Sequence, residues 1–158
     1  MEHKRLYFHD QLISYTYFDA SGAEKTTDVV NETADIKILF KTGKVARQFS
    51  MNKGSYQGDY IKYYPTGQVY EKCGYTDDEA TGEDIYYYSN GKIKEKKNYY
   101  FGSLDGLQQE YYQDGKLKET TNYKNGKQHG KCTKYDKNGK IVAALTYYND
   151  EIIAISNK

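Results

Sequence analysis

One stretch of the sequence decides the fold: residues 111–130 read YYQDGKLKETTNYKNGKQHG. Two of its glycines, Gly115 and Gly130, belong to two series in which successive glycines stand 24 residues apart. The first series is Gly43, Gly67, Gly91, Gly115 and Gly139, and the second is Gly58, Gly82, Gly106 and Gly130. An aliphatic column and several tyrosine columns keep the same step without a gap between residues 34 and 148. These columns identify a 24-residue internal repeat.

Each glycine of the first series closes a short turn. The turn at Gly91 reads SNG, the turn at Gly115 reads QDG, and the sole proline, Pro65, begins the turn that ends at Gly67. This pattern predicts a three-residue hairpin loop, in which a type I turn is followed by a residue at positive φ. Glycine adopts that conformation without a steric penalty, so we interpret the five glycines as structural turn residues.

Between the turns, side chains alternate with period two. After one turn, a single strand face carries Ile93, Glu95, Lys97 and Tyr99. We expect this face, which starts aliphatic and ends in tyrosine, to be buried. The sequence therefore predicts an all-β fold, an elongated single antiparallel β-meander of stacked hairpins. We expect a degenerate N-terminal repeat or cap over 1–33, the repeats over 34–148, and a C-terminal strand or cap over 149–158.

The composition suits such a thin β structure. The 158 residues include 20 tyrosines and no tryptophan, and the formal charge is only +1, which gives no pull toward nucleic acid or anionic membranes. The first ten residues, MEHKRLYFHD, lack the apolar core of a signal peptide, so we expect a cytoplasmic protein unless a leader has been removed. Cys73 and Cys132 stand 59 residues apart, which predicts free thiols and neither a disulfide framework nor a metal site. We expect no cofactor.

The sequence contains few side chains in patterns typical of a catalytic site. The sequence holds three histidines, and His129 near Cys132 is the nearest approach to a nucleophile with a base. Glu71, Glu95 and Glu119 recur at the repeat step. They could form a carboxylate ladder for metal or glycosidic chemistry, or each could serve its own unit by bonding a loop amide or a tyrosine hydroxyl. Their regularity favours the second interpretation, and we expect no enzyme.

Aromatic residues divide into periodic and irregular ones. The periodic tyrosines, such as Tyr63, Tyr87 and Tyr111, could stack a ligand, but their regularity favours packing within the sheet. The irregular ones are Tyr56, Tyr70, Tyr100 and Phe101. An irregular, exposed aromatic side chain is typical of a residue that anchors a protein partner.

Charge is also uneven along the chain. Residues 71–90 carry a net charge of −5, whereas residues 91–140 carry +6. The acidic loop Asp77, Asp78 and Glu79 is either a solvated turn or a patch that steers a basic partner. The basic stretch lacks the arginines of a phosphate track, so we expect no nucleic-acid binding.

The repeat columns resemble the bacterial form of the MORN repeat. That pattern consists of a tyrosine pair, a turn ending in Gly-Lys, an aliphatic residue, a glutamate, a tyrosine, a short loop and a glycine. Residues 111–130 match nearly every column, and the resemblance covers residues 34–148. In the outer units, Asp136 replaces the second tyrosine, and Arg47 and Ala143 replace the glutamate. The resemblance implies stacked β-hairpins in one long, twisted sheet.

Chains built almost wholly of this variant look like the YwqK-type antitoxin and immunity family. The resemblance therefore implies a protein that neutralises a cognate polymorphic or secreted bacterial toxin by direct protein–protein binding. The alternative is a general MORN-repeat scaffold without a toxin partner. We expect no membrane insertion and no small-molecule substrate. The predicted contact residues are Asp77, Asp78, Glu79, Tyr56, Tyr70, Tyr100 and Phe101.

Overall fold

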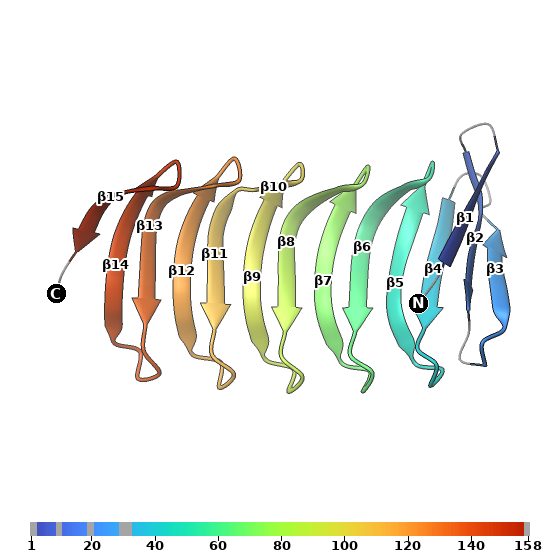
Figure 1. Cartoon of the computed structure of the whole chain (residues 1–158), viewed down its shortest axis with the longest axis horizontal. Helices are drawn as coiled ribbons and strands as arrows, with labels where there is room; N and C mark the ends of the chain where they lie inside the picture. The colour runs from blue at the N-terminus through green and yellow to red at the C-terminus, as the bar shows by residue number, and fades with distance from the viewer. Residues whose placement is uncertain (1–2, 9–10, 19–20, 29–32, 157–158) are drawn as a thin grey trace. The chain divides into compact units, whose positions relative to one another are not determined.

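The computed structural model describes residues 3–8, 11–18, 21–28 and 33–156, so parts of the two predicted caps fall outside the described residues. All of the regular secondary structure within these ranges is β-strand, as Figure 1 shows. No helix in the described ranges has the length and apolarity needed to span a lipid bilayer. The chain divides into two compact units, Met1–Glu79 and Ala80–Lys158.

The first unit contains a small sheet and the first repeat hairpins. The small sheet has the order β1-β2-β3. The following strands β4 to β7 pair antiparallel, each with the next in the chain. Their bounds are β1 His3–Phe8, β2 Gln11–Phe18, β3 Glu24–Asp28, β4 Thr33–Leu39, β5 Val45–Asn52, β6 Ser55–Tyr63 and β7 Val69–Thr76.

The second unit continues the same pattern. Its strands again pair antiparallel in chain order, except that the short β10 pairs only with β9, which then pairs with β11. The bounds are β8 Glu79–Tyr87, β9 Ile93–Tyr100, β10 Ser103–Leu104, β11 Gly106–Tyr111, β12 Leu117–Lys124, β13 Lys127–Tyr135, β14 Ile141–Tyr148 and β15 Glu151–Ser156. The predicted all-β meander of antiparallel hairpins is confirmed.

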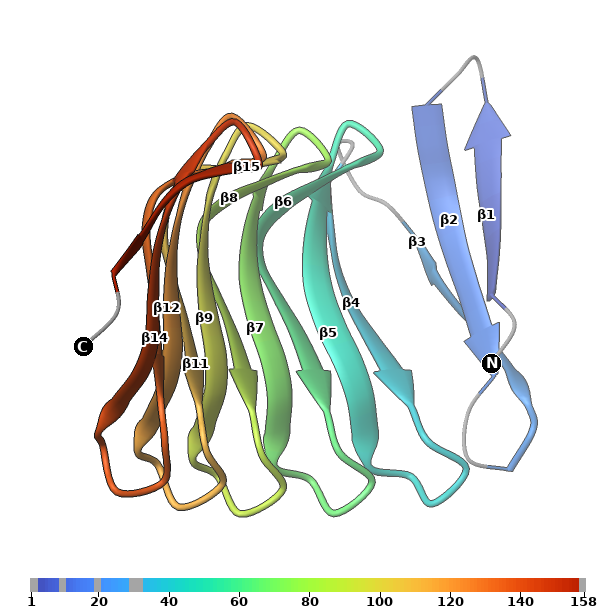
Figure 2. The same ribbon diagram turned by 60° about the vertical axis from the view of Figure 1, so that its left-hand side comes forward.

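Two kinds of turn alternate along the second unit, one at each end of its strands (Figure 2). In the three-residue turns, the glycine N–H donates to the carbonyl three residues earlier, as Gly115 does to Tyr112 at 2.8 Å. Tyr112 in turn donates its N–H to the Lys116 carbonyl at 2.8 Å, and Gly115 has a φ of 94°. This geometry requires a residue that tolerates positive φ at the third position.

The second kind is a two-residue turn in which both residues have positive φ, the pattern of a type I′ hairpin. The five turns are Lys53-Gly54, Asp77-Asp78, Phe101-Gly102, Asn125-Gly126 and Asn149-Asp150. They also stand 24 residues apart. This column was not predicted above, because only three of its five turns contain a glycine.

Burial follows the face expected from the alternation. In the first unit, the buried cluster consists of Ile36, Ile38, Phe49, Met51 and Tyr60. The same strand face is buried at Glu71 and Cys73 in β7 and at Thr121 in β12. Cys73 and Cys132 are both buried and free, as predicted. The buried face is therefore correct, but it carries polar groups that must find partners inside the chain.

Candidate protein-binding surface

Tyr100 and Phe101 are the most exposed of the predicted aromatic contact residues. Tyr100 ends β9, and Phe101 is the first residue of the turn to β10. Their side chains are 66% and 59% exposed, and their rings meet edge to face with centroids 4.8 Å apart. Two neighbouring, exposed rings on a short hairpin form an apolar knob of the kind that fills a pocket on a protein partner.

The backbone at Phe101 is strained. Its φ is 42°, in the left-handed region that bulky side chains rarely adopt. Asn125 and Asn149 occupy the equivalent turn position with φ of 50° and 49°, and asparagine tolerates this region. Gly102, the second residue of the turn, donates its N–H to the Ala80 carbonyl at 2.9 Å. The turn is thus tied to the neighbouring hairpin, and it carries a phenylalanine where the two following turns carry asparagine.

One further exposed aromatic belongs to the same column. Tyr148 follows Tyr100 by two repeat lengths and is 56% exposed. Its ring lies against that of His129, with centroids 5.1 Å apart. Tyr100 was predicted to be irregular, but the 24-residue step, extended to the end of the chain, gives it Tyr148 as a counterpart.

Tyr56 and Tyr70 do not fit the expectation of exposed aromatics. Tyr56 packs against the buried cluster of the first unit, with ring centroids 5.1 Å from Phe49 and 5.4 Å from Tyr60. Tyr70 is half-buried, and its ring meets that of Tyr64 edge to face at 5.2 Å. The expectation that both rings are exposed is wrong, because each ring packs against another aromatic side chain, Tyr56 on a neighbouring strand and Tyr70 in the adjoining turn.

The acidic loop has a structural component. The Tyr56 N–H donates to Asp78 Oδ1 at 2.7 Å, and the Asp78 N–H donates to the Tyr56 carbonyl at 3.2 Å. Asp150 makes the same two bonds with Gln128, at 2.8 and 3.0 Å. This carboxylate therefore ties its turn to the preceding hairpin. The side chains of all three predicted acids, Asp77, Asp78 and Glu79, are exposed.

The glutamate column forms ion pairs with lysines. Each member faces a lysine; the pairs are Glu71–Lys62 at 2.8 Å, Glu95–Lys97 at 2.9 Å and Glu119–Lys134 at 3.2 Å. The hydrogen bond and the negative charge of Glu119 raise the pKa of Lys134 above its ordinary value. Glu71 and Glu95 thus serve their own unit, as predicted, whereas Glu119 reaches a lysine on the following strand, β13. Each partner is a lysine and not a loop amide or a tyrosine hydroxyl.

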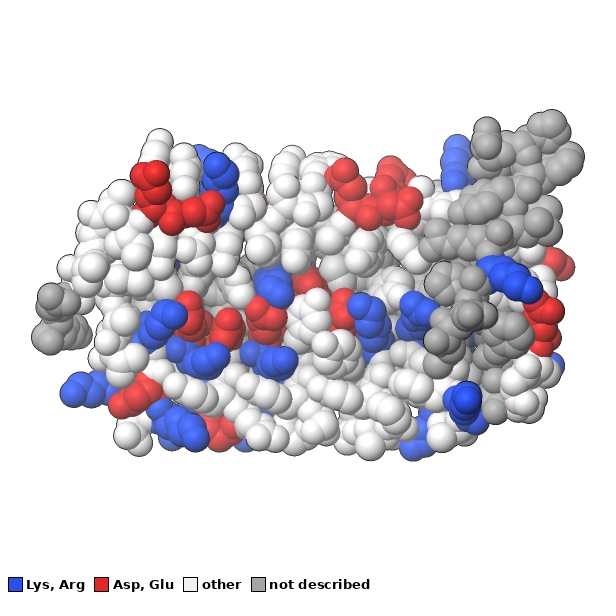
Figure 3. Space-filling view, viewed as in Figure 1, with Lys and Arg blue, Asp and Glu red and all other residues white. Residues whose placement is uncertain are grey.

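These pairs also reduce the positive charge of the lysine-rich stretch. Acidic and basic side chains lie next to one another over the strands of the second unit (Figure 3). Lys118, for example, pairs with Glu110 at 2.8 Å, and Glu110 raises the pKa of Lys118 through a hydrogen bond and its charge. Within the described ranges, no group of three or more histidine, cysteine, aspartate or glutamate side chains is arranged to hold a metal ion.

The second tyrosine of a pair before a three-residue turn links successive units at two places. Tyr88 donates its hydroxyl to the Tyr111 carbonyl at 2.7 Å, and Tyr112 donates to the Tyr135 carbonyl at 2.8 Å. The lysine after the turn glycine makes a similar link, since Lys116 Nζ donates to the Lys137 carbonyl at 2.8 Å. These periodic side chains therefore hold successive units of the stack together.

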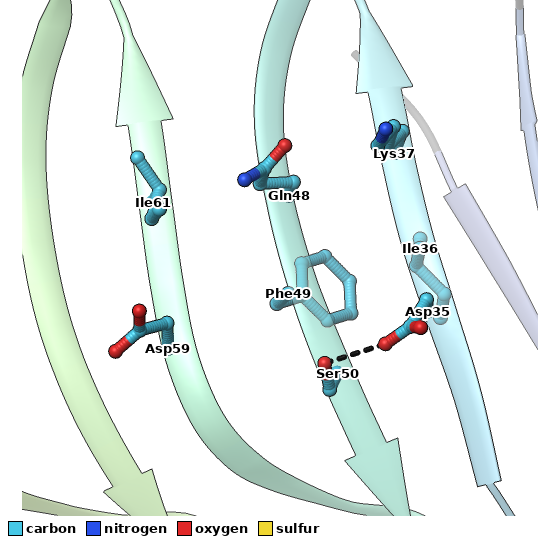
Figure 4. A pocket seen from close by; sticks show the side chains of 8 residues that line it. All are labelled: Asp35, Ile36, Lys37, Gln48, Phe49, Ser50, Asp59 and Ile61. Atoms are coloured by element: carbon cyan, nitrogen blue, oxygen red, sulfur yellow. Dashed lines mark hydrogen bonds between the residues drawn. The ribbon is translucent and has the colours of Figure 1, made fainter.

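A shallow polar hollow of about 310 Å³ lies over β4, β5 and β6 (Figure 4). Ser50 Oγ donates to Asp35 Oδ1 across it at 2.6 Å, and Asp59 lies on its other side. Neither histidine nor cysteine lines the hollow. Sequence reasoning did not point to this place, and we assign it no chemistry.

Comparison with known families agrees with the repeat. A family model described as the MORN repeat variant matches four segments, residues 56–77, 80–99, 104–125 and 128–150. No curated protein matches the chain. Each matched segment holds one of the two-residue turns or ends beside it, so the matched units coincide with the hairpins of the structure.

Proposed function

Since the chain belongs to the MORN repeat variant family, a repeat-based binding scaffold, we propose that it is an antitoxin or immunity protein. In this proposal it performs no reaction. It neutralises a cognate protein toxin by covering or distorting part of the toxin's surface. Such a role calls for a rigid platform and a small, desolvated anchor cluster rather than for catalytic groups.

The observation that carries the proposal is the conformation of Phe101. An exposed phenylalanine at positive φ is unfavourable twice, once through backbone strain and once through apolar surface left in water. An asparagine at this position would lower the strain and expose no aromatic ring, as Asn125 does in the following unit. A partner that buries the ring beside Tyr100 would offset these two terms on binding.

The turn also limits the entropy lost on binding. Phe101 lies in a two-residue turn, and the next residue, Gly102, is bonded to the Ala80 carbonyl of the neighbouring hairpin. A side chain on a backbone that is already ordered loses less freedom when a partner covers it. The exposed acids Asp77 and Glu79 add negative charge that would speed the approach of a basic toxin surface.

The proposal is tested by measuring binding to the product of the neighbouring gene by surface plasmon resonance. Phe101→Asn removes the ring and keeps a residue suited to the turn, and we expect it to raise the dissociation rate at least about tenfold. Lys53→Asn is the matched control, because Lys53 holds the equivalent position with a φ of 48° and carries no aromatic ring. We expect it to bind as the wild type does.

Two results would contradict the proposal. If Phe101→Asn and Lys53→Asn dissociate at the same rate, the aromatic knob is not the anchor. If the wild-type chain neither binds the neighbouring gene product nor suppresses its toxicity, the general scaffold without a toxin partner becomes the better interpretation.

A further inference from the structure

The strand β15 has an unusual surface for the edge of a sheet. It reads EIIAIS, and all six of its residues are exposed. Ile152, Ile153 and Ile155 are 52%, 62% and 64% exposed. Among the described residues, β15 pairs with β14 alone and ends the strand order. Its second edge therefore presents backbone N–H and carbonyl groups beside a row of isoleucines.

The repeat shows that Ile153 and Ile155 are not required by the hairpin. The positions equivalent to Ile155 in earlier units are Asp59, Glu83, Leu107 and Lys131, and those equivalent to Ile153 are Gln57, Thr81, Asp105 and His129. Internal strands thus carry mostly polar or charged residues at these positions. Exposed edges commonly carry charges that prevent pairing with other strands, so the change at β15 runs opposite to what a solvated edge needs.

We propose that β15 pairs antiparallel with β15 of a second copy of this chain about a two-fold axis. The occupant must be a β-strand, because the open edge offers backbone hydrogen bonds that only an extended chain satisfies along its length. A second copy brings the same three isoleucines, and a two-fold contact of identical strands is self-complementary. Every strand pair described in the chain is also antiparallel, so this contact continues the pattern already present.

The charge on the strand favours this orientation. Glu151 is the only charged residue of β15. Antiparallel pairing of two such strands places the two Glu151 side chains near opposite ends of the ladder, about 17 Å apart at about 3.4 Å per residue. Parallel pairing would place them side by side, where like charges repel. Self-association through β15 is thus compatible with its charge only in the antiparallel sense.

The experiment is sedimentation equilibrium of the full chain between about 1 and 500 µM, at near-physiological salt. We expect the wild-type mass to rise from 18.3 kDa toward twice that value as concentration increases. Ile155→Lys should stay at the monomer mass throughout. The substitution copies Lys131, which occupies this column in the preceding unit, so the hairpin accommodates it.

The matched control is Leu107→Lys, which makes the same chemical change in the same column. Leu107 is 39% exposed, but its strand β11 has strand neighbours on both sides. We expect this variant to associate as the wild type does. Ile153→Thr, which copies Thr81, is a second edge variant and should weaken association at least fivefold.

A wild-type chain that stays monomeric over the whole range would overturn the proposal. The proposal would also be wrong if Ile155→Lys still dimerised, or if Leu107→Lys lost dimerisation to the same extent as Ile155→Lys. Circular dichroism of each variant checks that the hairpins remain folded. The toxin-binding test depends on Phe101 and not on β15, so the two proposals fail independently.

Discussion

Two substitutions of Phe101 separate its backbone strain from its ring contact. Phe101→Ala and Phe101→Asn both remove the edge-to-face contact with Tyr100. They differ in how well the new residue tolerates a φ of 42°. Alanine keeps the ordinary penalty of the left-handed region, about 1–2 kcal/mol, whereas asparagine recovers part of it through local hydrogen bonds. We therefore expect Phe101→Asn to be more stable than Phe101→Ala by about 0.5–1 kcal/mol.

The stability of the wild type relative to these two variants follows from the exposure of the two rings. An aromatic pair contributes about 0.5–1.5 kcal/mol, and rings that are 66% and 59% exposed belong at the lower end. Loss of the contact should lower the stability of Phe101→Ala by about 0.5 kcal/mol. In Phe101→Asn the relieved strain offsets this loss, so its stability should equal or exceed that of the wild type by up to about 0.5 kcal/mol.

Thermal unfolding followed by circular dichroism measures these differences. For a chain of this length, about 1 kcal/mol corresponds to about 2–4 °C in the midpoint. We expect Phe101→Asn to unfold about 1–4 °C above Phe101→Ala. The control compares wild-type Asn125 with Asn125→Ala, because this comparison tests the backbone strain at an equivalent position that has no aromatic ring. If alanine and asparagine give the same midpoint at 101 but differ at 125, the strain assigned to Phe101 is wrong.

Three further outcomes are expected. Tyr112→Phe should lower stability by about 1 kcal/mol in urea unfolding, because it leaves the Tyr135 carbonyl without its 2.8 Å partner, whereas the exposed Tyr148→Phe should change little. Gly91→Val should lower stability by about 1–3 kcal/mol through backbone strain, because φ is 81°, although nothing lies within 4 Å of the added Cβ. Hydrogen exchange should show the loss of protection near this turn first, and a uniform loss would contradict the repeat model. Burial raises the pKa of the Cys132 thiol in the folded chain, so the unfolded chain ionises at a lower pH. The contribution of Cys132 to the free energy of unfolding is therefore intact below the unfolded thiol pKa and is lost as pH rises above it. The urea midpoint should therefore fall less steeply above pH 8 in Cys132→Ala, and identical slopes would refute this.

The repeat could be predicted from the sequence because its signals are local and recur. A turn glycine at positive φ, such as Gly115, needs no distant contact to be recognised. The same step then repeats the prediction in unit after unit, so errors at one position are corrected at the next. Hairpin order follows as well, since a three-residue turn leaves two strands no choice but to pair antiparallel.

The structural role of the glutamate column could be predicted only in part. Its regularity indicated that each carboxylate serves its own unit, which holds for Glu71 and Glu95 but not for Glu119. Its partner, Lys134, comes from the next strand, and the register of that strand depends on a bulge between Thr121 and Tyr123. A bulge shifts which residues face each other, and nothing in the periodicity of a single strand specifies it.

The sequence by itself determined the 24-residue period, the turn positions and the all-β class, because these depend on backbone preferences of residues close together in the chain. Only the tertiary structure decided which irregular aromatic residue is free to meet a partner. Tyr56 and Tyr100 depart from the repeat alike, yet Tyr56 packs against Phe49 on a neighbouring strand while Tyr100 is 66% exposed. Burial is a property of the neighbours that a side chain meets across strands, and those neighbours are set by the packing of the whole hairpin stack.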